Sequence, residues 1–188
     1  PGSITSSALG TAAATVAGGA ALDLQGQTLA NKLTLAGTGP AAGGALRNTA
    51  AATATVSGVL ELSANSSISS VGDLVISGTV DATSTAVSST LTVANSAGLS
   101  LQAAVGGTRA LSGLSIQGTS ELAGPGINTT GGQTYTGTVT LAADNTLASS
   151  AAGAIRFESA VAGGHAFTVN TAGATVFAAG AGAAPGTA

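Results

Sequence analysis

Large apolar residues recur in short alternating pairs along this chain of 188 residues. Each pair encloses one polar or small residue, and a Gly, Asn, Asp or Ser follows within a few positions in most cases. A period of two places both large side chains on one face of an extended strand, and the residues that follow mark turns. The pairs include Leu22 and Leu24, Leu33 and Leu35, Leu60 and Leu62, Leu74 and Ile76, Leu91 and Val93, and Leu99 and Leu101. Strands this short cannot enclose a core alone, so we expect them to stack.

The alanine-rich composition does not change this interpretation. A helix needs apolar residues at spacings of three and four and little glycine, whereas this chain holds 29 glycines. Disorder requires low hydrophobicity and high net charge, whereas 44% of the residues are hydrophobic and the net charge is −3. We therefore expect a single folded all-β domain over residues 1–188.

An internal repeat indicates how the strands stack. Segment 57–108 resembles segment 136–182: Leu62 aligns with Leu141, 79 residues later, and Ile76 aligns with Phe157, 81 residues later. The offset drifts while the apolar order is kept, which is typical of a solenoid with variable turns and fixed inward positions. With a strand every 6 to 10 residues, the pattern predicts a parallel β-helix of about nine coils, each of roughly 20 residues and three short strands.

The coil model assigns a place to each residue type. Val, Leu, Ile and Ala are expected inside, Thr and Ser on the outer face, and Gly and Asn at the corners. Phe157, Phe167 and Phe177 align with inward residues of the repeat and are expected in the core. Tyr135 has no such counterpart, and the sequence leaves it free to face either way.

The composition excludes several partners and cofactors. The four basic residues are Lys32, Arg47, Arg109 and Arg156, which are far apart in sequence, so no basic patch is expected and nucleic acid is not a predicted partner. The absence of cysteine excludes disulfides and thiolate metal sites. Neither a nucleotide-binding nor a metalloprotease motif occurs, and no cofactor is predicted. Glycine and threonine interrupt the apolar runs, so no membrane span is expected. The start at Pro1 shows no signal peptide, and we expect mature or excised material.

Nearly the whole chain resembles a known family, and three stretches carry the resemblance. LDLQGQTLANKLTLAGTG at residues 22–39 is similar to the passenger repeats of bacterial autotransporters, and GALRNTAAATATVSGVLELSANSSISSVGDLVISGTV at residues 44–80 has the same character. TTGGQTYTGTVTLAADNTLAS at residues 129–149 is similar to repeats of filamentous-haemagglutinin-type exoproteins. The resemblance implies a right-handed coil, export by a type V secretion route, a place on the bacterial cell surface, and a role in adhesion, biofilm or surface structure.

Candidate catalytic groups are sparse. No two of the seven carboxylates lie within five residues of each other, although stacking could bring Glu61 to Asp81, or Asp144 to Glu158. We favour solvated surface positions for all of them. His165, the only histidine, is expected to lie in a turn. We therefore predict no enzymatic activity, with a polysaccharide-active β-helix enzyme as a remote alternative.

Candidate surface contacts lie in a threonine-rich segment. The alternation of Thr134, Thr136, Thr138 and Thr140 predicts hydroxyls along one strand face, with Tyr135 beside them. Thr134, Tyr135, Thr136 and Thr138 are the predicted contact residues. Arrays of Thr-x-Thr on successive coils would suit ice binding, and the sequence offers only scattered counterparts at Thr53 and Thr55 and at Thr90 and Thr92.

Two classes of function follow. The chain is either a structural element, a stalk or filament segment that stacks on itself, or a module that binds glycans or matrix protein without self-assembly. We expect it to be a segment or repeat unit of a longer chain. The tail Pro185–Ala188 would then lead into another copy of Pro1–Ile4.

Overall fold

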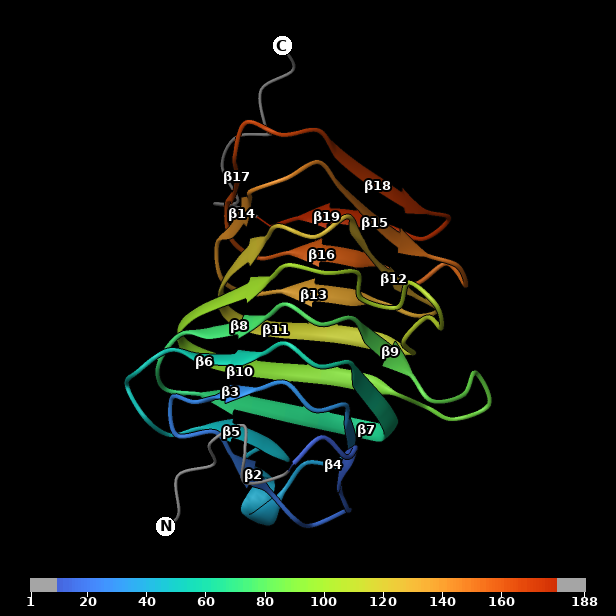
Figure 1. Ribbon diagram of the computed structural model, residues 1–188. Coiled ribbons are helices and arrows are strands. Elements are labelled where there is room, and N and C mark those ends of the chain that lie inside the picture. Colours follow the sequence, from blue (N-terminus) through green and yellow to red (C-terminus); the bar gives the residue numbers. More distant parts are fainter. Residues whose placement is uncertain (1–9, 179–188) are drawn as a thin grey trace.

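The computed structural model describes residues 10–178 and is a parallel β-solenoid. The coils stack from β1 to β19 into a rod (Figure 1). Every strand pair in this range is parallel: 16 strands form one continuous sheet that wraps around the rod, and three form a second. The sequence-based prediction of an all-β solenoid is therefore confirmed. The proposed junction of Pro185–Ala188 with Pro1–Ile4 lies outside the described residues.

The strands are short except where one continues through a corner. Within residues 10–178, the single helical element is the 3₁₀ helix η1 (Pro40–Ala42). The strands are β1 (Ala14–Val16), β2 (Leu22–Asp23), β3 (Thr28–Leu29), β4 (Leu33–Gly37), β5 (Leu46–Asn48), β6 (Ala54–Val56), β7 (Leu60–Ser70), β8 (Leu74–Ile76), β9 (Val80–Ala82), β10 (Thr90–Leu101), β11 (Gly113–Leu122), β12 (Gly126–Thr129), β13 (Gln133–Tyr135), β14 (Val139–Leu141), β15 (Asn145–Ser149), β16 (Ile155–Phe157), β17 (Val161–Ala162), β18 (Phe167–Thr171) and β19 (Thr175–Phe177).

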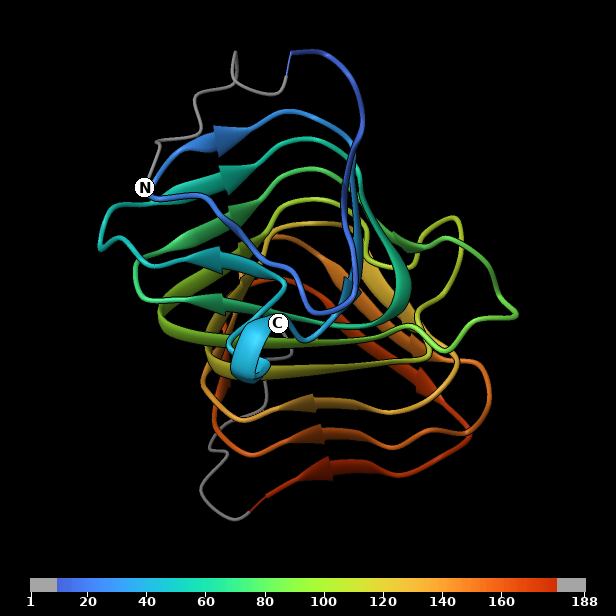
Figure 2. The same ribbon diagram turned by 90° about the horizontal axis from the view of Figure 1, so that it is seen from below.

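Each coil has three sides, as the second view shows (Figure 2). We call them faces A, B and C. Face A holds β2, β5, the second half of β7, the first halves of β10 and β11, then β13, β16 and β19. Face B holds β3, β6, β8, the second halves of β10 and β11, then β14 and β17. Face C holds β1, β4, the first half of β7, β9, a bridge at Val105, then β12, β15 and β18.

The rod has about seven turns, so the predicted nine were too many. Register partners on successive coils are 19 residues apart at Val16 and Leu35, but 27 apart at Leu35 and Leu62. The longer coils carry extra residues at the corners, such as η1 and the loop of residues 83–89. Three strands per coil were predicted correctly, because the alternation is a property of the strands. The corner lengths were underestimated.

The interior is a set of apolar ladders with one residue from each coil. On face B, residues at the same position of successive strands pair in register and are all buried: Val56, Ile76, Leu101, Leu122 and Leu141. Fully burying one such side chain stabilises the fold by about 1.5–3 kcal/mol. The stack therefore needs no network of ion pairs for its stability.

On face A the ladder becomes aromatic in the C-terminal coils. The Phe157 ring stacks on Tyr135 at 5.1 Å and on Phe177 at 5.0 Å between centroids, and it meets Phe167 edge-on at 5.7 Å. Phe157 is fully buried and Phe167 packs against the core, as predicted. Phe177 stacks on Phe157 but is 48% exposed, so its prediction as a core residue was only half right.

Polar side chains also enter the interior beside this aromatic stack. The Tyr135 hydroxyl donates to Gln133 Oε1 at 2.8 Å, and Gln133 Nε2 donates to the carbonyl oxygen of Ala148 at 2.9 Å. Both side chains are fully buried, and burial raises the pKa of the Tyr135 hydroxyl. Each polar atom used here has a partner, so the pair costs little on burial.

The corner between faces B and C is built from closely approaching backbone. Asn31, Gly58 and Gly78 lie two residues before register-matched strand residues and so occupy the same corner position on successive coils. A Cβ atom on Gly78 would lie 2.0 Å from the carbonyl oxygen of Gly58, and a Cβ atom on Gly58 would lie 2.0 Å from that of Asn31. Glycine is therefore required at these two positions, because a side chain would collide with the backbone of the adjacent coil.

The internal repeat does not map each strand onto a strand of the same face. Leu62 lies on face C, whereas its aligned partner Leu141 lies on face B. Ile76 lies on face B, and its partner Phe157 lies on face A. The aligned residues all point inward, but the second copy is displaced by one face around the rod.

Candidate functional site

The outer surface of face A carries a row of hydroxyl groups. Four residues pair in register on successive coils, and we call them the hydroxyl row: Ser67, Thr92, Ser115 and Thr134. Neighbouring strands in a sheet lie about 4.8 Å apart, so the row repeats at that spacing. Ser67 Oγ donates to the carbonyl oxygen of Thr38 at 3.2 Å. Within residues 10–178, the other three hydroxyls make no hydrogen bond to protein and face outward.

The predicted contact residues divide between the inside and the outside. Thr134 belongs to the hydroxyl row, Thr136 is exposed and Thr138 is half-buried. Tyr135 is fully buried, so the prediction of a surface contact there was wrong: the alternation that turns Thr134 outward turns Tyr135 into the core. The chain also bends between β13 and β14, which places Thr140 on face B. The threonine run therefore does not lie along a single strand.

The structure also shows why a regular threonine plane does not form. Thr53 and Thr55 flank an inward residue of β6 on face B, and Thr138 and Thr140 flank the equivalent residue of β14. The three coils between them carry other outward pairs, namely Asp73 and Val75, Gly98 and Ser100, and Thr119 and Glu121. Two carboxylates and an apolar side chain interrupt the array that ice binding would need.

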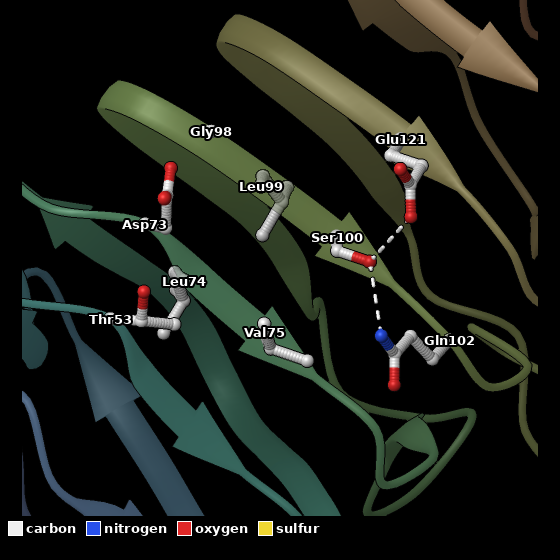
Figure 3. A pocket seen from close by; sticks show the side chains of 9 residues that line it. All are labelled: Thr53, Asp73, Leu74, Val75, Gly98, Leu99, Ser100, Gln102 and Glu121. Atoms are coloured by element: carbon white, nitrogen blue, oxygen red, sulfur yellow. Dashed lines mark hydrogen bonds between the residues drawn. The ribbon is translucent and has the colours of Figure 1, made fainter.

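The residues that interrupt the threonine array line a shallow groove on face B, with a volume of about 420 Å³ (Figure 3). Ser100 Oγ donates to Glu121 Oε1 at 3.0 Å, and Gln102 Nε2 donates to Ser100 Oγ at 3.4 Å. Asp73 lies on the opposite side of Ser100, and both carboxylates are exposed. The groove is lined by Thr53, Asp73, Leu74, Val75, Gly98, Leu99, Ser100, Gln102 and Glu121. It offers hydrogen-bond acceptors to a ligand on an open surface.

A charged cluster lies on face C. Glu61 and Asp81 are register partners on adjacent coils, so stacking does bring them together, but Asp81 is only 6% exposed and the expected solvated surface position was wrong for it. Glu61 Oε1 lies 2.9 Å from Lys32 Nζ and 3.6 Å from Arg109 Nη2, which brings together two of the four basic residues. Asp81 Oδ1 accepts the backbone N–H groups of Thr108, at 2.9 Å, and Arg109, at 3.0 Å. Glu61 is thus paired with two cations, and Asp81 holds the loop that follows the bridge at Val105 through backbone hydrogen bonds.

Replacing Asp81 with alanine is expected to loosen this loop. Asp81 is 6% exposed, and its loss leaves two backbone N–H groups without their acceptor, which costs about 1–3 kcal/mol. Hydrogen exchange should accelerate at Thr108 and Arg109. Asp144, whose side chain is 77% exposed, provides the control, because Asp144→Ala should change stability by less than about 0.5 kcal/mol. Equal effects of the two substitutions would contradict the role assigned to Asp81.

The other predicted carboxylate pair is not formed. Asp144 Oδ1 accepts the N–H of Ala166 at 2.9 Å and lies 3.6 Å from His165 Nδ1, whereas Glu158 Oε1 accepts a hydrogen bond from Arg156 Nε at 2.9 Å. Each carboxylate therefore has its own partner at a different corner. His165 lies in the bend between β17 and β18, as predicted.

No group of three or more His, Cys, Asp or Glu residues that could hold a metal ion occurs in residues 10–178. In the same range, no helix has the length and apolar character that a membrane crossing requires. The fold and its surface thus define a parallel β-solenoid with mainly neutral, hydroxyl-bearing faces. The chain matches no protein-family model, no curated protein and no solved structure.

Proposed function

We propose that this chain is an extracellular structural and adhesive β-solenoid, a stalk or filament segment of a secreted bacterial surface protein, without enzymatic activity. The observation that carries the proposal is the hydroxyl row on face A, where four successive coils hold Ser or Thr in matched register on parallel strands. Such a surface presents both donors and acceptors to another hydroxyl-rich surface.

Charge and packing support the same function. Only 6% of the residues are charged, and the contacts of Glu61 and of Arg156 with Glu158 pair opposite charges with each other. The ladders run through all the described coils, so the interior supports a continuous rod. A rod with little charge on its sides is suited to weak contacts repeated along its length, which become strong together.

Attachment of cells that display the chain tests this proposal. The substitutions Thr92→Val, Ser115→Ala and Thr134→Val together remove three hydroxyls of the row and preserve strand preference. Cells displaying the native chain should adhere to surfaces coated with polysaccharide or matrix protein, and the triple variant should adhere at least tenfold less well. The matched control is Thr55→Val with Thr140→Val on face B, which should adhere like the native chain.

Two results would overturn the proposal. One is the absence of attachment to every coated surface by a chain that electron microscopy shows to be a folded rod. The other is shortening of an added polysaccharide by the purified chain, which would indicate an enzyme. Circular dichroism of each variant separates loss of attachment from loss of fold.

A further inference from the structure

A second groove, of about 400 Å³, lies at the corner between faces A and B, beside the hydroxyl row. Its floor and walls come from successive coils, mainly the C-terminal ends of β5 and β7 and the corner within β10. We call it the corner groove, and it is lined by Asn48, Thr49, Ser69, Ser70, Val71, Ala94, Asn95, Ser96, Gln117 and Gly118. Its volume falls within the range of small-molecule sites, about 300–1,000 Å³.

No ionisable side chain lines the corner groove. A charged ligand would lose water there without gaining a countercharge, which is unfavourable. The face B groove, with Asp73 and Glu121, has the opposite character. Complementarity therefore favours a neutral ligand in the corner groove.

One wall of the corner groove is held rigidly. Thr49 Oγ donates to Asp23 Oδ2 at 2.6 Å, and Asn48 Oδ1 accepts the N–H of Gly26 at 2.9 Å. Partial burial alone would raise the pKa of Asp23, but the hydrogen bonds from Thr49 and Gln25 outweigh it and hold the pKa below its ordinary value. The Asp23 carboxylate therefore stays ionised and keeps the Thr49 hydroxyl oriented. A wall that is ordered before binding reduces the entropy lost when a ligand binds.

Other groups in the corner groove remain free for a ligand. Within residues 10–178, neither the Gln117 amide nor the Ser96 hydroxyl makes a hydrogen bond to protein, and both residues are exposed. Asn95 is 8% exposed and its Nδ2 donates to the carbonyl oxygen of Thr119 at 2.8 Å, so this buried amide holds the corner and is not among the free groups. Val71 is 54% exposed and adds an apolar contact to these amides and hydroxyls.

A peptide is a poor fit at this position. Peptides that bind to sheets usually add a strand to an open edge. Here β10 pairs with β7 and β8 on one side and with β11 on the other, so its backbone has no open edge. The ligand must be recognised through side chains, by hydrogen bonds and one apolar contact.

From this geometry we infer that the corner groove binds a neutral oligosaccharide segment, with sugar hydroxyls bound by Gln117 and Ser96 and a sugar C–H face against Val71. A neutral glycan carries both donors and acceptors and exposes apolar C–H groups, which are the three features the lining complements. This assignment rests on the proposed adhesive function and names the class of its partner.

The test is titration of the chain with cellohexaose, xylohexaose, mannohexaose and laminarihexaose, and with a hexagalacturonate as the acidic comparison. At least one neutral hexasaccharide should bind and shift the amide resonances of Ser96 and Gln117. Ser96→Trp, which fills the groove from an exposed position, should weaken that binding at least tenfold, and Gln117→Ala should weaken it severalfold. Thr140→Trp, at an exposed position on face B, should bind like the native chain.

The outcomes separate this inference from the proposed function. If no neutral hexasaccharide binds, or only hexagalacturonate does, the corner groove is not a neutral glycan site, while attachment that depends on the hydroxyl row would leave the adhesive function intact. Binding that Ser96→Trp leaves unchanged would likewise overturn the inference. If the folded native chain neither binds a glycan nor supports surface attachment, both proposals are overturned.

Discussion

Replacing Phe157 with alanine is expected to lower the free energy of unfolding by about 3–5 kcal/mol, among the largest effects of any single substitution in this chain. The ring is fully buried between Tyr135 and Phe177, with centroid separations of 5.1 and 5.0 Å. Its removal leaves a cavity that the parallel strands on either side cannot close. Denaturant unfolding followed by circular dichroism measures the change.

The matched control for Phe157→Ala lies in the same ladder. Phe177→Ala removes the same ring from the next coil, where the residue is 48% exposed, and should cost less than half as much. Similar losses for the two substitutions would mean that the stack is not the main source of stability in these coils.

Replacing Gly78 with alanine should also destabilise the solenoid, by about 3 kcal/mol, the upper end of the usual cost of overpacking. The added Cβ would lie 2.0 Å from the carbonyl oxygen of Gly58 on the adjacent coil, so the corner between faces B and C must open. The strands that follow Gly58 and Gly78, β7 and β9, are paired with each other, so the backbone at the contact has little freedom to move apart. A loss of thermal stability together with faster hydrogen exchange near residues 58 and 78 would be observed.

Gly164 supplies the control for this corner. A Cβ atom there would meet nothing within 4 Å, so Gly164→Ala should leave the melting temperature nearly unchanged. If Gly78→Ala were equally mild, the coil spacing at this corner would have to be far more adaptable than the 2.0 Å approach implies.

The inward positions were predictable because strand alternation is a local property of the sequence. Leu33 and Leu35 point inward in β4 as the period of two requires, and both are fully buried. The number of coils was not predictable in the same way. Turn residues such as Gly39 and Gly44 mark a corner but do not reveal that a 3₁₀ helix, η1, lies between them.

The site was harder to predict than the core. Tyr135 points inward together with Gln133. Because glutamine is usually exposed, the sequence does not show the apolar alternation that would have predicted an inward Tyr135. That stacking could bring Glu61 to Asp81 was predictable, because both lie in regular strands of adjacent coils. The contact of Arg109 with Glu61 was not, because Arg109 comes from a loop whose path depends on the coil beneath it.

The displaced internal repeat has a consequence for how such a chain can change over time. Because Leu62 on face C and Leu141 on face B occur in the same sequence context, a strand with its turn is interchangeable among the three sides of the rod. An insertion or deletion of one such unit would preserve the buried ladders. It would rotate every outward-facing residue that follows it by one third of a turn about the axis of the rod. The number of strands that precede a binding surface therefore determines the side of the rod on which that surface lies. Related solenoids can change this side during evolution while their buried ladders stay the same.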